Sequence, residues 1–130
     1  MIVVDASVLV VALVDDGNDG SIARRRLVGE VLVAPELIDL EVLSVLRRTV
    51  ALGAITALRG KNAIADLIDL PLRRASHAPL LARCWELRPN LTSYDASYVA
   101  LAEALDVTLV TADGRLAKAP GLRCAVELLT

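Results

Sequence analysis

The stretch that most constrains the fold stands at the amino end of the chain, where a short apolar run ends in an acid and then a hydroxyl. Ile2, Val3 and Val4 are β-branched, which favours a buried strand, and Asp5 and Ser7 follow directly. In an open α/β sheet, ligands bind in the crevice beyond the carboxyl ends of the parallel strands. We therefore expect this strand to bring Asp5 to the functional edge of a sheet.

Apolar runs alternate with amphipathic stretches along the rest of the chain, a pattern typical of strands joined by helical crossovers. The predicted strands cover residues 2–4, 31–34, 70–75, 107–110 and 123–129, and the predicted helices cover 8–14, 21–28, 35–53, 57–70, 79–87 and 93–105. Such alternation favours a parallel sheet with right-handed crossovers. We predict an α/β fold, a three-layer α/β/α sandwich around a mostly parallel sheet of four to five strands, with residues 1–130 forming a single domain.

Several residues suggest where these elements begin and end. Ser7 is placed to cap the first helix, Pro35 suits the first position of a helix, and Gly53 would close that helix. The turn-rich stretch 15–20 predicts a loop. Thr56 can cap the next helix, and Pro71 makes the strand at 70–75 an edge strand, because proline has no N–H to donate to a neighbouring strand.

Composition limits the ways in which the chain could bind nucleic acid. The net charge is −2, and there are only two tyrosines, one tryptophan and no phenylalanine, so base stacking on an aromatic platform is not expected. Twelve of the 14 basic residues are arginines, several of them clustered at 24–26, 47–48 and 73–74. Arginine suits phosphate because of its planar fork, although each cluster also fits a solvated helix face.

The sequence also indicates a compartment. Asp5, Asp15 and Asp16 interrupt the first apolar run before it reaches the ~18 residues of a membrane span, and no export signal is recognisable. We expect a cytoplasmic protein in which Cys84 and Cys124 are free thiols. The high aliphatic content suggests a self-association face or a partner groove.

Three aspartates occupy positions that a parallel fold would bring together. Asp5 and Asp113 each follow a predicted buried strand, and Asp95 lies in the first turn of the helix that leads into the second of these strands. Taken singly, each has an ordinary explanation as a helix cap, a turn residue or an acid that complements a helix dipole, with Thr92 as a cap beside Asp95. As a set, they predict an acidic site.

A fourth acid within the predicted helix 35–53 can be chosen in two ways. Glu41 has Leu37, Ile38 and Val45 at helical spacing and no basic partner there, so its burial would be costly. Asp39 is almost as unfavourably placed. The pattern of residues does not choose between Glu41 and Asp39.

Converging carboxylates require a cation. Ionised carboxylates about 5 Å apart repel by roughly 3 kcal/mol per pair at an effective dielectric of about 20. An all-oxygen site favours Mg²⁺ or Mn²⁺ over Zn²⁺. His77, the only histidine, stands beside Ser76 and Pro79 near a predicted helix start and is expected on the surface, which excludes Ser-His-Asp chemistry.

Four segments, in this order, resemble the PIN-domain ribonucleases, and the small size resembles VapC, the toxin of toxin–antitoxin pairs. The segments are IVVDAS at 2–7, Pro35 followed by Glu41, YDASYVALA at 94–102 and LVTADGRL at 109–116. The resemblance covers nearly the whole chain. It implies a metal-dependent endoribonuclease whose acidic cluster and Mg²⁺ or Mn²⁺ ligands are Asp5, Glu41, Asp95 and Asp113, and it favours Glu41 over Asp39.

The resemblance also implies partners and auxiliary residues. Ser7 and Thr111 match polar positions that line such sites, and Arg115 and Lys118 are possible phosphate contacts. The implied substrate is structured RNA such as tRNA or rRNA, the implied inhibitor is a VapB-type antitoxin, and the implied assembly is a homodimer without membrane attachment. The alternatives are a PIN-type nuclease of RNA processing without an antitoxin and a non-catalytic interaction module with the same fold.

Overall fold

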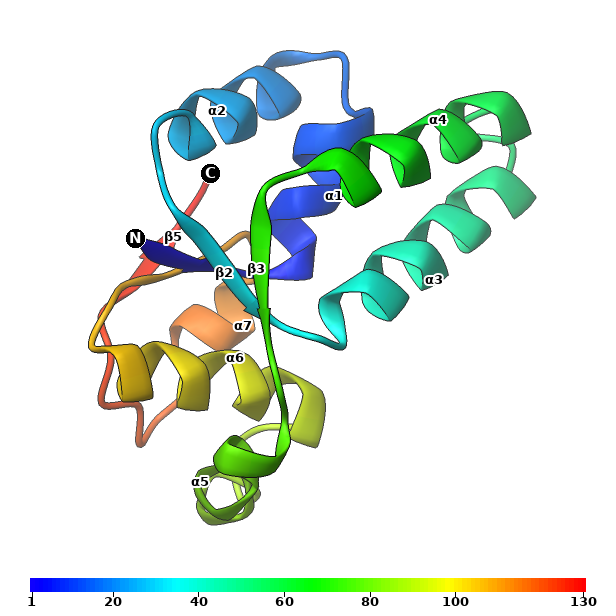
Figure 1. The fold of residues 1–130 in the computed structure, drawn as a ribbon. Coiled ribbons are helices and arrows are strands. Elements are labelled where there is room, and N and C mark those ends of the chain that lie inside the picture. The colour runs from blue at the N-terminus through cyan, green and yellow to red at the C-terminus, as the bar shows by residue number, and fades with distance from the viewer.

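The chain folds around a five-stranded parallel sheet flanked by helices, as the sequence predicts (Figure 1). The computed structural model describes all 130 residues. Its strands lie in the order β3-β2-β1-β4-β5, and every neighbouring pair is parallel. The strands are β1 (Ile2–Val4), β2 (Leu32–Pro35), β3 (Leu72–Ala75), β4 (Leu109–Thr111) and β5 (Val126–Leu128).

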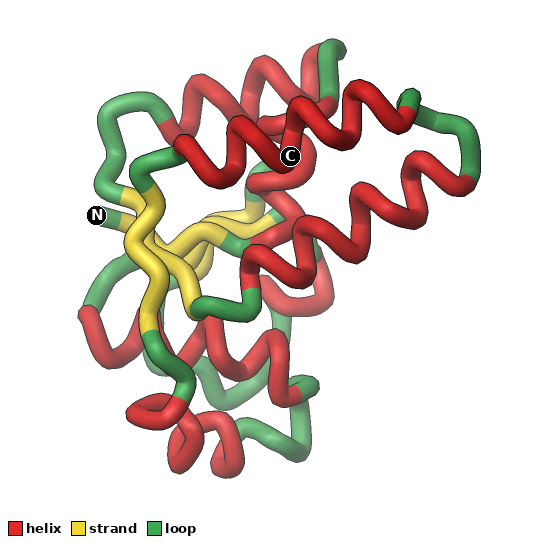
Figure 2. Tube along the Cα trace, turned by 45° about the vertical axis from the view of Figure 1, so that its right-hand side comes forward, coloured by secondary structure: helices red, strands yellow, loops and turns green.

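Helices cover both faces of this sheet. They are α1 (Ala6–Val14), α2 (Asn18–Leu27), α3 (Ile38–Ala51), α4 (Ala57–Asp69), α5 (Leu81–Glu86), α6 (Ser93–Leu105) and α7 (Gly114–Ala117), with a 3₁₀ turn at Ala78–Leu80. Helices α1, α2 and α4 lie on one side, whereas α5 and α6 lie on the other (Figure 1). Helices α3 and α4 form an antiparallel pair that projects from the sheet (Figure 2). None of these helices has the length and apolarity needed to cross a membrane.

The core forms around β1, the central strand. Val3 and Val4 are fully buried, and Val3 lies in register with Val33 of β2 and Leu109 of β4. Helix α6 is buried along seven consecutive residues, from Ala96 to Ala102, because it packs against β1, β2 and β4. The carboxyl end of β1 is thereby held between those of β2 and β4, the position that the sequence predicts for a functional edge.

Pro35 differs from its prediction as the first residue of a helix. It is the last residue of β2, in register with Ala75 of β3, and α3 begins only at Ile38. The next N–H, that of Glu36, donates a 3.0 Å hydrogen bond to the Ala75 carbonyl, so the pairing continues past the proline. The edge position predicted for the strand with Pro71 before it is correct, since β3 ends the sheet.

The loop predicted at 15–20 is also shorter than expected, because α2 already begins at Asn18. A Cβ atom on Gly20 would lie 1.8 Å from the carbonyl oxygen of Asp15, so this glycine permits close approach of α2 to the backbone at the end of α1. Arg24 of α2 also connects the two helices, because its Nη1 donates a 2.7 Å hydrogen bond to the same Asp15 carbonyl. The short helix α7 was not predicted at all, since four residues carry too little periodic signal.

Candidate active site

Four acids from four separate parts of the chain line one pocket of about 290 Å³. Its lining residues are Asp5, Ala6, Ser7, Glu41, Ser44, Val45, Arg48, Asp95 and Asp113. Asp5 directly follows β1, and Asp113 comes two residues after β4. The other two acids lie near the starts of α3 and α6. The parallel topology therefore assembles the acids, because it brings these strand ends and helix starts to one edge of the sheet.

Asp5 is held by two hydroxyl groups that donate to the same carboxylate oxygen. Ser7 Oγ donates a 2.7 Å hydrogen bond to Asp5 Oδ2, and Thr111 Oγ1 donates one of 2.8 Å to the same oxygen. Both hydroxyls also accept from the backbone, Ser7 from Ala112 N–H at 3.0 Å and Thr111 from Asp113 N–H at 3.0 Å. The network joins β1 to the loop after β4 and fixes the orientation of the Asp5 carboxylate.

This network corrects the expected role of Ser7. The N-cap position of α1 belongs to Asp5, whose side chain makes no capping hydrogen bond, and Ser7 is already the second residue of the helix. Its hydroxyl serves Asp5 and Ala112 instead. Ser7 therefore supports the acidic pocket and does not cap the helix.

Glu41 is held by Tyr98, a residue for which the sequence predicts no role in the acidic site. Tyr98 is fully buried, and its hydroxyl donates a 2.6 Å hydrogen bond to Glu41 Oε1. No local signal links positions 41 and 98, because the hydrogen bond joins a residue of α6 to a residue of α3, 57 positions apart in the sequence. The carboxylate of Glu41 is thereby oriented into the pocket that contains Asp5 and Asp95.

Asp39, the alternative to Glu41, lies outside the acidic pocket. Arg74 of β3 binds both of its oxygens, with Nε at 2.8 Å from Oδ2 and Nη2 at 2.9 Å from Oδ1. This bidentate pair satisfies Asp39. The structure therefore separates two acids that the pattern of residues could not distinguish.

Burial and mutual repulsion act together on the carboxyls of the pocket. Asp5 is only 6% exposed, and burial raises its pKa although the two hydroxyls partly oppose the effect. Burial likewise raises the pKa of Glu41, and the negative charges of Asp5 and Asp95 add to it. Burial is again the main cause of the raised pKa of Asp95. Three acids are thus held where their charged forms are disfavoured, and a bound cation would relieve this.

Asp113 combines a structural contact with its place in the pocket. Its Oδ1 accepts a 2.9 Å hydrogen bond from Arg115 N–H, which makes it the N-cap of α7, as the turn interpretation expects. The Arg115 side chain is 97% exposed, with Nε 3.9 Å from Asp113 Oδ1, so it stands at the rim of the site. Lys118 follows α7 and does not line the pocket.

The donor set is chemically suited to a hard divalent cation, because every candidate ligand in the pocket is an oxygen. As the side chains lie, however, no group of three acids, histidines or cysteines is arranged to hold a metal ion. Asp5 Oδ2 is engaged by Ser7 and Thr111, whereas Oδ1 accepts from no side chain. Binding an ion would therefore require rotation of some of the other carboxylates toward Asp5.

Sequence reasoning missed three lining residues on α3: Ser44, Val45 and Arg48. They follow Glu41 by three, four and seven positions, the spacing that places residues on one face of a helix. This periodicity would have found them once Glu41 was chosen. It shows that one face of α3 forms a wall of the site.

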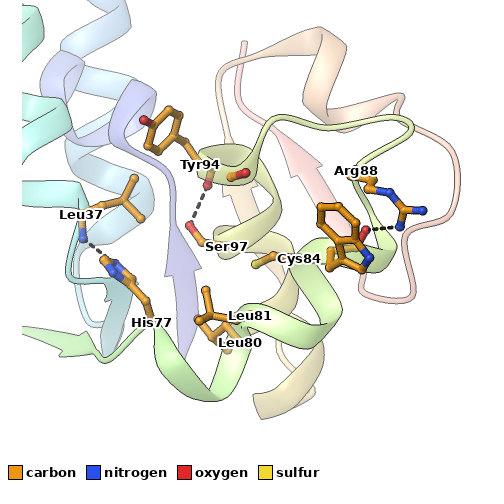
Figure 3. Close-up of a pocket in the computed structure, with 10 residues that line it drawn as sticks. Leu37, His77, Leu80, Leu81, Cys84, Arg88, Tyr94 and Ser97 are labelled. Carbon is orange, nitrogen blue, oxygen red and sulfur yellow. Dashed lines mark hydrogen bonds between the residues drawn. The ribbon is translucent and has the colours of Figure 1, made fainter.

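A separate apolar cavity of about 440 Å³ lies between α5, α6 and the loop after β3 (Figure 3). His77 lines it and is partly buried, not on the surface as predicted, and its Nε2 accepts a 3.0 Å hydrogen bond from Leu37 N–H. Leu81, Trp85 and Tyr94 border the cavity and remain largely exposed. None of the four pocket acids lines this cavity, so it is distinct from the candidate active site.

The comparison with protein families agrees with this arrangement. The family model described as PIN domain matches residues 2–122, a span that includes all four acids of the pocket. The chain therefore belongs to the PIN-domain family.

Full-length relatives narrow this class to VapC ribonucleases. Ribonuclease VapC9 of Mycobacterium tuberculosis is 43% identical over 129 residues, covering 99% of this chain and 98% of the relative. Ribonuclease VapC1 of the same species is 44% identical over 128 residues, covering 98% and 96%. At this level of similarity over whole chains, the enzyme class, a ribonuclease, is shared.

Solved structures support the fold at much lower identity. VapC20 of M. tuberculosis, described as a sarcin-ricin loop cleaving toxin, aligns with a TM-score of 0.70 at 18% identity, covering 89% of this chain and 92% of that one. VapBC2 of Rickettsia felis, solved with a DNA fragment from its promoter, gives a TM-score of 0.73 at 15% identity with full coverage of both chains. These likenesses concern the architecture of the sheet and helices.

Proposed function

We propose that this ribonuclease hydrolyses phosphodiester bonds within structured RNA, such as tRNA or rRNA, with Mg²⁺ or Mn²⁺ as cofactor. The observation that carries the proposal is the single pocket in which Asp5, Glu41, Asp95 and Asp113 meet. Three of these acids have raised pKa values, mainly through burial, which supports their role as ligands of a cation. All four are proposed as catalytic metal ligands.

Three of the acids have a contact or a position that holds them at the pocket. Asp5 is oriented by the hydroxyls of Ser7 and Thr111, whereas Glu41 is oriented by the hydroxyl of Tyr98. Asp95 lies in the first turn of α6, whose start is capped by a 3.2 Å hydrogen bond from Asp95 N–H to Thr92 Oγ1. When bound, a divalent cation lowers the pKa of a water molecule and neutralises charge on a phosphodiester.

The test is direct cleavage of RNA by the purified protein. Total cellular RNA incubated with the protein and Mg²⁺ or Mn²⁺ should yield discrete new ends, which sequencing would map, and chelation with EDTA should prevent their appearance. An Asp95→Asn preparation made in parallel controls for contaminating nucleases. If neither metal supports cleavage of any cellular RNA, the enzyme assignment fails and the non-catalytic alternative gains support.

We further propose that the chain acts as a toxin that a VapB-type antitoxin restrains. The R. felis neighbour was solved as VapBC2 bound to DNA from its promoter, and the proposal transfers a VapB partner to the present chain. Leu40 and Leu43 are exposed on α3, the helix that also carries Glu41, and Ile68 is exposed on the adjacent α4. These residues line a groove between α3 and α4 that suits an amphipathic helix, on a different face of α3 from the one that lines the acidic pocket.

The neighbouring gene and a growth assay test this partner. A short reading frame directly upstream with a DNA-binding amino terminus should encode the antitoxin, and co-expression should restore growth that the nuclease alone arrests. A Leu40→Glu, Leu43→Glu variant should still arrest growth but escape the rescue. The absence of such a gene would favour the RNA-processing alternative.

A homodimer is the proposed assembly. The apolar cavity bordered by the exposed side chains of Leu81, Trp85 and Tyr94 supports it, because contiguous apolar surface of this kind marks interaction sites. Light scattering should give twice the mass of the chain, and Trp85→Glu should reduce it to the mass of one chain. A monomeric mass for the unmodified protein would contradict the proposal.

A further inference from the structure

Arg48 is a cation in the wall of an acidic pocket that forms no ion pair with the acids. It lines the same cavity as Asp5, Glu41, Asp95 and Asp113, yet it takes part in none of the salt bridges of the structure. Arg48 is exposed to solvent. A guanidinium that faces four carboxylates without contacting one is free to bind another anion.

The topology places Arg48 and Arg115 on opposite sides of the acids. Helix α3 follows β2 and helix α7 follows β4, and these strands flank β1 from its two sides. Arg48 lies seven residues beyond Glu41, about 10 Å further along α3 at 1.5 Å per residue. Ser44, between them on the same helix face, adds a hydroxyl. The acids therefore have a cation at each border of the pocket.

This arrangement meets a requirement of the substrate. RNA is a polyanion, and a pocket of carboxylates repels every phosphate except the one that a bound cation neutralises. Phosphates on either side of the cleaved bond need cations of their own, and the planar fork of arginine binds phosphate through two parallel hydrogen bonds.

We propose that Arg48, assisted by Ser44, forms a subsite for a backbone phosphate of the RNA strand, on the α3 side of the bond that is cleaved. The strand then runs from α3 across the acids to Arg115 on α7. This subsite rests on the proposed ribonuclease function, since it positions the same substrate. Arg48 does not touch the reacting phosphate and acts in binding.

Arg47 provides a matched control, because it is the adjacent arginine on α3, is exposed and does not line the pocket. On an RNA that the unmodified protein cleaves, Arg48→Ala should raise KM about 10-fold or more and leave kcat nearly unchanged, whereas Arg47→Ala should change neither. In a plot of log affinity against log salt concentration, the magnitude of the slope should decrease by about 0.7 for Arg48→Ala and should stay the same for Arg47→Ala.

A chemical cycle identifies the phosphate. A series of RNAs each carries one uncharged methylphosphonate linkage, at a different position around the cleaved bond. At one position, on one side of the cleaved bond, the linkage should weaken binding to the unmodified protein. At the same position, it should not weaken binding to the Arg48→Ala variant any further. The subsite would be overturned, with the nuclease assignment intact, if Arg48→Ala and Arg47→Ala had equal KM values. It would also be overturned if every methylphosphonate linkage that weakens binding to the unmodified protein weakened binding to Arg48→Ala as well. Complete absence of cleavage by the unmodified protein would overturn the proposed function and the subsite with it.

Discussion

Thr111 Oγ1 donates a 2.8 Å hydrogen bond to Asp5 Oδ2 across 106 positions of sequence. The bond joins the ends of two neighbouring strands, β1 and β4, at the point where the acids meet. Since Thr111 is fully buried and also accepts from Asp113 N–H, one hydroxyl orders two of the four acids. Loss of this hydroxyl should therefore affect both the fold and the affinity for a cation.

Thr111→Val tests that hydroxyl with almost no change of volume. The variant should unfold about 1–3 kcal/mol more easily, because Asp113 N–H and the Asp5 carboxylate each lose a buried partner. The Mg²⁺ concentration that gives half-maximal cleavage should rise about 10–100-fold. Thr111→Ser keeps the hydroxyl and should remain near the unmodified protein in metal titrations; if both variants respond equally, the methyl group and not the bond is responsible.

Asp95→Asn should reduce cleavage by at least about 100-fold, the upper end of what loss of a supporting partner costs a metal site. Its fold should persist, because asparagine keeps the shape of the side chain. Asp39→Asn is the matched control: it weakens the partly exposed pair with Arg74 by about 1 kcal/mol and leaves cleavage unchanged. Urea unfolding and single-turnover cleavage measure the two effects. Loss of cleavage in Asp39→Asn would reverse the assignment of Glu41.

Tyr98→Phe removes the hydroxyl that holds Glu41. The hydrogen bond to the carboxylate opposes the burial that raises the pKa of Glu41, so its loss should raise that pKa further. We expect unfolding to become about 1.5–3 kcal/mol easier and the acidic limb of the cleavage profile to move to higher pH. Tyr94→Phe alters an exposed tyrosine and should leave the profile in place. An unshifted profile in Tyr98→Phe would show that Glu41 does not need this support.

Without metal, the acidic pocket should destabilise the fold as pH rises. The pKa values of Asp5 and Asp95 are raised above the ordinary 3.8, so the unfolded chain releases these protons first and the folded chain holds them longer. The folded state binds more protons in that interval, and its stability falls as pH rises until the folded carboxyls have also ionised. Saturating Mg²⁺ should reverse the loss at neutral pH.

The measurement must isolate these acids, because the pKa values of Glu30 and Glu103 are lowered by arginine partners and contribute stability in the opposite direction. The difference in unfolding free energy between Asp5→Asn and the unmodified protein does so. This difference should grow in favour of the variant from about pH 4 to pH 7 in EDTA. A difference that stays constant over this range would show that ionisation of Asp5 does not destabilise the folded protein.

The sequence could predict the parallel sheet and three of the pocket acids because both follow from local pattern. Buried strands end just before Asp5 and near Asp113, and Asp95 lies in the first turn of a capped helix. Contacts between distant segments carry no such signal. The hydrogen bond from Tyr98 to Glu41 joins two helices, and the pairing of Arg74 with Asp39 joins a strand to a helix, so both depend on how distant elements are placed in the fold. Local propensity even misleads at Pro35, where pairing with β3 overrides the preference of proline for a helix start.

The place of β1 in the sheet also governs when the site can first exist. The acids stand at positions 5, 41, 95 and 113, and the strand that carries the first of them is paired on one side by β4, near the end of the chain. During synthesis, β1 and Asp5 therefore emerge long before β4 and Asp113, and the pocket can form only after β4 has paired with β1. A nascent chain on the ribosome would carry no assembled nuclease site until the segment from β4 to Asp113 had been made and had left the ribosome.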